Sequence, residues 1–222
     1  MRKGFCLLRI VFVGVTGLLL TGCLLKKAAV PTRHFVLAAT CTNEPAPRAA
    51  EPLAVGIGFV KMPSQLLRDS LAVQTDANEI RYLEDALWAE RLDQAFQRTV
   101  AANLSRLLSS NRIYLSAWRR DQVLMTVYIN VQQFDVDTRG RGKLIAQWRI
   151  TAPGGEIPLK SGDAHYSVTG ASPRANPEVI AATLSELVGD FSRDLAQSIR
   201  VSLKSSTNVL VKEPLSSWTR MP

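Results

Sequence analysis

Few side chains in this sequence are of the types that carry out acid–base, nucleophilic or metal chemistry, and those few lie far apart. There are two histidines, His34 and His165, and neither has a second ligand residue at the spacing of a metal site. No G-x-S-x-G sequence places a nucleophilic serine on a strand-to-helix turn. No H-E-x-x-H sequence or cysteine pair indicates zinc. The sequence therefore predicts a protein that is not an enzyme and needs no cofactor.

Three weaker candidates are acidic pairs and a basic loop. Glu84 and Asp85 are adjacent, and Glu90 and Asp93 are one helical turn apart. We interpret both pairs as turn and helix-start residues, since carboxylates are favourable at a helix N-terminus. The run Arg139–Lys143, R-G-R-G-K, could hold a phosphate through backbone N–H groups and charge. A solvated hairpin tip is the favoured interpretation of that run.

A sharper signal lies near the start of the chain. An almost wholly apolar run covers residues 10–20, and three basic residues precede it: Arg2, Lys3 and Arg9. This run is about half the ~20 residues that a membrane-spanning helix needs. A charged start, a short apolar region and small residues before a cut site describe a secretory signal peptide. The alternative, a transmembrane anchor, is disfavoured because the run is too short.

The signal ends in Leu20-Thr21-Gly22-Cys23, which resembles the lipobox of bacterial lipoproteins. The resemblance implies a lipid-transfer step on the Cys23 thiol followed by cleavage between Gly22 and Cys23. Residues 1–22 are then the signal peptide, and Cys23 carries diacylglyceryl and acyl chains that anchor the protein to a membrane. Leu24 is not acidic, which by the same resemblance favours the periplasmic face of the outer membrane.

After removal of the signal, Cys41 is the one cysteine left besides the lipidated one, so no internal disulfide can form. A free thiol is the favoured interpretation, and an intermolecular bridge is the alternative. Losing the three basic residues of the signal lowers the formal net charge from +8 to +5. This charge suits an anionic membrane surface or an acidic partner. No basic helix with interleaved aromatic residues indicates nucleic acid.

Apolar periodicity predicts the elements that position these groups. Two helices are expected over residues 90–108 and 176–203, the second capped by Asn176 with Pro177 in its first turn. A short helical turn is expected over residues 64–67. Short apolar or alternating runs predict strands, which cover residues 33–39, 53–60, 70–75, 79–84, 112–118, 123–136, 143–151 and 165–170.

The clearest alternation occurs in residues 123–136. One face of this strand is expected to hold Val123, Met125, Val127, Ile129 and Val131. The strand should form a long antiparallel hairpin with residues 143–151. Gly56 and Gly58 share a face of another strand, where glycines mark a bulge or a close backbone approach.

These elements predict a single-domain α+β fold with a mostly antiparallel sheet and two long helices on one face. The domain is expected over residues 53–203. Residues 23–52 would hold the lipidated N-terminus, the first strand and a Pro-rich link. Residues 204–222 are expected to form a flexible tail.

Two segments resemble the ABC-type transport auxiliary lipoproteins, the PqiC-like family. Val55-Gly56, Pro63, Leu66 and Arg68 match its first motif, a valine-glycine strand leading to a proline. Trp88-Ala89-Glu90 followed by Leu92-Asp93 matches its second motif. The strand containing Gln147–Ile150 and the last helix also fall where the family has them, so the resemblance covers most of the mature chain.

The chain departs from the family at two positions. Arg91 stands where the family usually has proline, and Gln65 stands where an aromatic residue is common. Trp88, Glu90 and Arg91 have two interpretations. They form either a helix start with the tryptophan packed beneath it or a surface for a partner.

The resemblance implies a non-catalytic subunit of an ABC transport system that moves lipids between the inner and outer membranes. Its partner would be a protein of the MCE (mammalian cell entry) type, whose conduit it would dock at the outer membrane, and it could form a homo-oligomer. One alternative is an outer-membrane assembly lipoprotein that chaperones or plugs a β-barrel. Others are a lipid-anchored hydrolase or small-ligand binder, and a domain that itself carries a lipid in an apolar groove.

Overall fold

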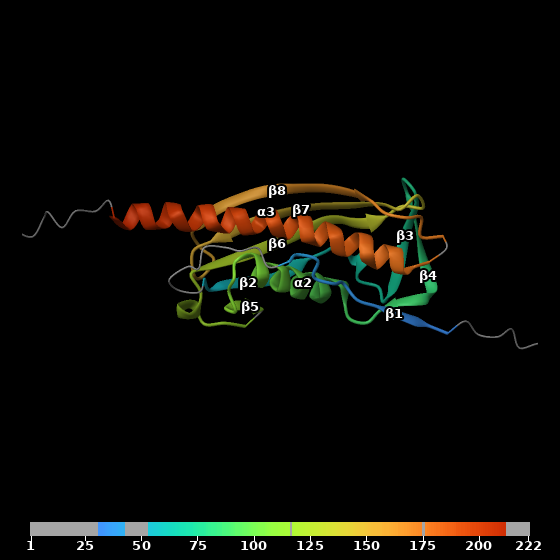
Figure 1. Cartoon of the computed structure of the whole chain (residues 1–222), viewed down its shortest axis with the longest axis horizontal. Coiled ribbons are helices and arrows are strands. Elements are labelled where there is room, and N and C mark those ends of the chain that lie inside the picture. Colours follow the sequence, from blue (N-terminus) through green and yellow to red (C-terminus); the bar gives the residue numbers. More distant parts are fainter. Residues whose placement is uncertain (1–30, 43–52, 116, 175, 212–222) are drawn as a thin grey trace, which may run out of the picture. The chain divides into compact units, whose positions relative to one another are not determined.

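The computed structural model describes residues 31–42, 53–115, 117–174 and 176–211. The predicted signal peptide and Cys23 lie outside these ranges. The described strands form two sheets, and two long helices accompany them; Figure 1 shows their arrangement. In the five-stranded sheet the spatial order is β5 (Ile113–Leu115), β2 (Val55–Lys61), β6 (Met125–Val136), β7 (Arg141–Thr151) and β8 (Pro158–Thr169). In the three-stranded sheet it is β1 (Arg33–Phe35), β4 (Glu79–Trp88) and β3 (Ser70–Asp76). The helices are α2 (Leu92–Leu107) and α3 (Glu178–Val211), and short 3₁₀ turns cover Ser64–Leu66 and Arg120–Gln122.

The predicted α+β fold with two helices on one sheet face is confirmed, but both sheets are mixed. β2 runs parallel to β5 and to β6, and β1 runs parallel to β4. The β3–β4, β6–β7 and β7–β8 pairs are antiparallel. The parallel pairs join segments distant in sequence, since Val55 lies opposite both Ile113 and Met125. Side-chain alternation identifies a strand, but it specifies neither its direction nor its partner.

The long hairpin of β6 and β7 forms as predicted, with one change in its buried face. Val127, Ile129 and Val131 are buried against the helices. A register shift between Val131 and Gln133 then moves the buried positions to Phe134 and Val136. An extra residue in one strand reverses which face the following side chains occupy.

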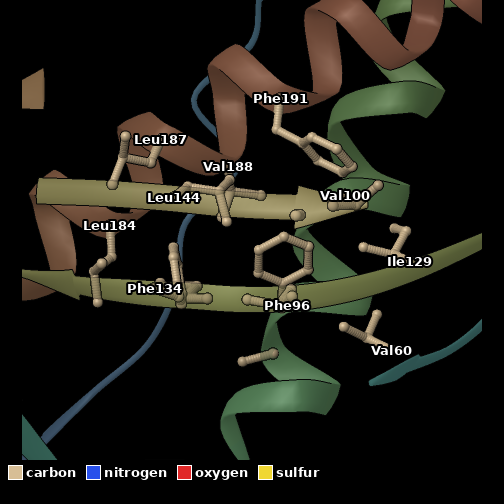
Figure 2. Close-up of a cluster of buried hydrophobic side chains, with 14 of the residues drawn as sticks. Val60, Phe96, Val100, Ile129, Phe134, Leu144, Leu184, Leu187, Val188 and Phe191 are labelled. Carbon is tan, nitrogen blue, oxygen red and sulfur yellow. The ribbon is translucent and has the colours of Figure 1, made fainter. Parts of the chain in front are cut away.

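The core lies between the helices and the sheet (Figure 2). Phe96 of α2 meets Phe134 of β6 edge-on, with 5.3 Å between ring centroids. The Phe96 ring also lies 5.9 Å from that of Phe191 in α3. Leu144 and Val188 pack beside them, and all five side chains are buried. Phe96 therefore contacts both the other helix and the sheet.

The structure corrects several predicted boundaries. The helix predicted from Glu90 begins at Leu92, and Trp88 is the last residue of strand β4. Glu84 and Asp85, predicted to be turn residues, lie exposed within β4.

The last helix starts as predicted and ends later. The Oδ1 atom of Asn176 accepts a hydrogen bond from the backbone N–H of Glu178 at 3.1 Å, which confirms the cap. The helix continues to Val211 rather than ending near Leu203. Residues 204–211 of the predicted flexible tail are thus helical.

Residues 36–41, called the strap below, follow β1 and bind to both helices. The N–H of Ala38 donates to Ser185 Oγ of α3 at 3.0 Å. The N–H of Cys41 donates to Asn103 Oδ1 of α2 at 3.1 Å. Three more α2 side chains donate to strap carbonyls: Arg98, Thr99 and Arg106. Side chains thus replace the hydrogen bonds that a neighbouring strand would supply.

Contacts with the strap also account for two buried side chains, the polar Asn103 and the free Cys41. Asn103 belongs to the apolar stripe of α2 and is fully buried, and its Nδ2 donates to Ser192 Oγ of α3 at 3.2 Å. The Cys41 thiol is free and 2% exposed. Burial raises the pKa of this thiol. The burial supports the free-thiol interpretation over an intermolecular bridge.

Replacing Asn103 with alanine should lower the free energy of unfolding by about 2–4 kcal/mol. The change removes the acceptor of the Cys41 N–H and the donor to Ser192 inside the core. Urea unfolding followed by circular dichroism measures the loss. Asn111→Ala is the control, because Asn111 is exposed and its replacement should change stability by less than about 0.5 kcal/mol. A similar small effect at both positions would contradict the role assigned to Asn103.

Candidate functional surfaces

The side chains that could take part in catalysis or metal binding do not converge in the described part of the chain. His34 and His165 are both exposed and lie on different sheets. Among the described residues there is no group of three or more His, Cys, Asp or Glu side chains placed to hold a metal ion. No described helix combines the length and the apolar character needed to cross a bilayer.

The three residues predicted as a possible partner surface divide between core and surface. Trp88 is 7% exposed and belongs to the core, which favours the interpretation in which it packs beneath the helix start. Glu90 pairs with Arg98 at 2.6 Å, and Arg91 pairs with Asp93 at 2.9 Å. Glu90 and Arg91 are accessible from solvent, but both already pair with side chains in the first two turns of α2.

A polar groove of about 500 Å³ lies between the β3–β4 turn and the ends of β6 and β7. It includes the R-G-R-G-K run, with Arg139, Arg141 and Lys143 among its lining residues. Acidic residues also line this hairpin groove, Asp135 and Asp137 among them. Its charges are therefore largely matched within the groove.

Asp137 organises this hairpin tip. Its Oδ1 accepts the N–H groups of Arg139 and Arg141 at 2.8 and 2.9 Å, and its Oδ2 accepts the Arg141 Nε at 2.7 Å. Partial burial by itself would raise the pKa of the Asp137 carboxyl, but these bonds outweigh burial and lower the pKa. Two backbone N–H groups of the run are already bonded to Asp137, so a structural turn is favoured over a phosphate site.

A second groove, of about 520 Å³, lies on the face of the five-stranded sheet opposite the helices. Its walls come from three neighbouring strands. The side chains that shape this sheet groove are Phe59 and Lys61 from β2, Tyr128 and Asn130 from β6, and Gln147 and Arg149 from β7. Ile129 and Trp148 complete the lining, so none of the lining residues is acidic.

The groove depends on a bulge in β2. Ile57 pairs with Val127 and Val60 pairs with Ile129, so two β2 residues lie opposite Tyr128 alone. A Cβ atom at Gly58 would lie 3.0 Å from the Tyr128 ring, which explains the glycine. The sequence predicted this bulge or close approach, and the structure confirms it.

The same bulge determines where Phe59 points. Val55 and Ile57 are buried against the helices, and regular alternation would place Phe59 on their face. The extra residue reverses the alternation, so that Val60 is buried and Phe59 is 77% exposed. Sequence reasoning missed Phe59, because an apolar residue that continues the alternation of Val55 and Ile57 is expected in the core.

Comparison with known proteins identifies the fold and the family. The family model of the ABC-type transport auxiliary lipoprotein component matches residues 35–196. No curated protein matches the chain. One solved structure, of an uncharacterized protein, has a TM-score of 0.61 at 19% identity, covering 77% of this chain and 99% of that one. Another, a Xanthomonas campestris protein of the family model DUF330, has a TM-score of 0.66 at 11% identity, covering 80% and 99%. At these identities the structural likeness shows the fold alone.

Replacing Asp137 with asparagine should cost about 1–3 kcal/mol of folding stability at pH 7. The folded-state pKa is lowered, so the stabilisation is fully present above the unfolded pKa of about 3.9 and disappears as pH falls through the folded pKa. Urea unfolding at pH 7 and near pH 2 tests this. The difference between the two proteins should shrink at the lower pH. A pH-independent difference would show that the charge of Asp137 is not what stabilises the turn.

Proposed function

Because the chain belongs to the ABC-type transport auxiliary lipoprotein family, we propose that it is a non-catalytic, lipid-anchored subunit of an MCE-type system. This system moves lipids between the inner and outer membranes. The subunit is held at the periplasmic face of the outer membrane through Cys23, and there it docks the end of the MCE conduit. Residues 1–22 serve only for export and lipid transfer.

The family match over residues 35–196 carries this proposal, and the lipobox at Leu20–Cys23 supports it. Each CH₂ group of the attached chains that enters the bilayer contributes about 0.8 kcal/mol to anchoring. Arg33, where β1 begins, is ten positions after Cys23, and such a tether spans at most about 35 Å. The folded domain therefore remains close to the membrane that holds Cys23.

The folded surface suits a docking role. The two large grooves are open on the surface and are lined by side chains of several strands. An accessory subunit works through such contacts with other proteins. The competing role, chaperoning or plugging an outer-membrane β-barrel, would use the same anchor but a different partner.

Replacing Cys23 with serine should leave an uncleaved precursor in the inner membrane, because serine has no thiol for lipid transfer. Membrane fractionation and the apparent mass on a gel measure both effects. Cys41→Ser is the matched control, since Cys41 is buried within the fold, and this variant should be processed normally. If Cys23→Ser protein fractionated with the outer membrane at the mature mass, the anchor assignment would be wrong.

Crosslinking in native cells, followed by purification through a C-terminal tag and mass spectrometry, should recover an MCE-domain protein. The Cys23→Ser variant is the control and should lose this partner, because it is held in the wrong membrane. Recovery of a β-barrel protein instead would favour the assembly role. Recovery of neither class would remove the transport assignment while leaving the family and the fold intact.

A further inference from the structure

The sheet groove has the composition of a protein-binding surface. Its aromatic side chains include Phe59 and Tyr128, and its charged residues are Lys61 and Arg149. The cores of protein interfaces are enriched in aromatic residues and arginine and are depleted of acidic residues. Phe59 is 77% exposed, so its ring has apolar area available for burial against a partner.

The two cations lie on the strands that flank β6, Lys61 on β2 and Arg149 on β7. Within the described residues neither Lys61 nor Arg149 forms an ion pair. The Arg149 guanidinium lies 5.4 Å from the centre of the Tyr128 ring, which holds it over the groove. In the strand register Arg149 of β7 lies opposite Tyr128 of β6, and Lys61 of β2 lies opposite Asn130 of β6. The groove thus combines aromatic side chains with one cation on each side of β6.

The amide side chains complete the recognition chemistry. Asn130 lies directly opposite Gln147 on the exposed face of β6 and β7. Each amide offers both a donor and an acceptor, which is what the backbone of a bound polypeptide requires. Gln147 donates to Asp163 at 3.2 Å in an exposed contact that a ligand could replace.

We propose that the sheet groove binds a segment of a partner protein in which a large apolar side chain lies next to an aspartate or glutamate. The apolar side chain packs on Phe59 and Tyr128. The carboxylate pairs with Arg149 or Lys61, and the amides of Asn130 and Gln147 bond the segment's backbone. That this partner is the transport conduit rests on the proposed function, whereas the chemistry of the segment rests on the groove alone.

Two other occupants fit less well. A lipid chain needs an enclosed apolar space, but Val127 and Ile129 are buried in the packed core beneath this open face. A second copy of the chain could offer Glu156 and Ile157, which are exposed. The Glu156 carboxylate pairs with Arg120 of its own chain at 3.5 Å, so a second copy would have to give up this exposed contact to supply it.

The test places the photocrosslinking residue p-benzoylphenylalanine at position 59 of the full lipidated chain in its native cells. Val36, 53% exposed and outside the groove, is the control position. Irradiation should join position 59, and not position 36, to a peptide of another protein that has an acidic residue beside a large apolar one. Both positions are exposed, so the fold should be retained, and an unchanged thermal unfolding midpoint checks this.

Charge reversal makes the result specific. Arg149→Glu should lower the adduct yield about tenfold, the change that roughly 1.4 kcal/mol produces. Arg68→Glu is the matched control, because Arg68 stacks on Tyr82 at 4.7 Å much as Arg149 stacks on Tyr128, but outside the groove. Replacing the partner's acidic residue with lysine should restore the yield with Arg149→Glu.

Other outcomes would overturn the groove proposal or separate it from the proposed function. An adduct with the mass of a phospholipid, or one with a second copy of the chain, would show that the groove has a different occupant. Recovery of an MCE-domain protein through the C-terminal tag without any adduct at position 59 would refute the groove and leave the proposed function standing. An acidic-apolar peptide from a protein of another class would support the groove and refute the proposed partner.

Discussion

The burial of one face of the five-stranded sheet under both helices is the constraint from which the other features follow. The single side chain of Phe96 contacts both β6, through Phe134, and α3, through Phe191. The buried apolar side chains of β2, β6 and β7 face this contact, so strand alternation sends the remaining side chains to the opposite face. That opposite face holds the sheet groove, which exists because the core is one-sided.

The strap extends this constraint to the start of the folded domain. It follows β1 directly and lies against α2 and α3, where Asn103 bonds both the strap and Ser192 of α3. The buried polar groups in this region are satisfied by one another: among the described residues no buried side-chain polar atom lacks a partner. Hydrogen bonds from the strap to Ser185 of α3 and to Asn103 of α2 therefore fix the start of the folded domain to both helices.

Local patterns in the sequence were sufficient for the parts of the fold that local patterns control. The β6–β7 hairpin follows from alternation on both sides of a glycine-rich turn, and the helices follow from their apolar stripes and from Asn176. Pairings between distant segments could not be predicted, because nothing near Val55 specifies that it lies between Ile113 and Met125. The burial of Trp88 was left open for the same reason, since it depends on elements that pack over β4 from elsewhere in the chain.

The sheet groove was harder to predict because it combines register with an irregularity. Gly56 and Gly58 indicated a bulge, but its consequence for Phe59 depends on which β2 residues face Tyr128. Lys61 and Arg149 come from strands that are distant in sequence, and they flank one groove only because β6 lies between β2 and β7. The chemistry of the surface is thus a property of the sheet order.

The bulge also bears on why this surface exists. A regular β2 strand would bury Phe59 and expose Val60, and the larger ring gains more from burial. The observed register instead buries the valine and leaves the phenylalanine in solvent. Since the isolated domain loses apolar burial by this choice, the exposed ring is better explained by contact with a partner than by the stability of the fold. Bulges are over-represented where a side chain is redirected for function, and here the redirected side chain lies in a groove that holds two cations and no acidic residue.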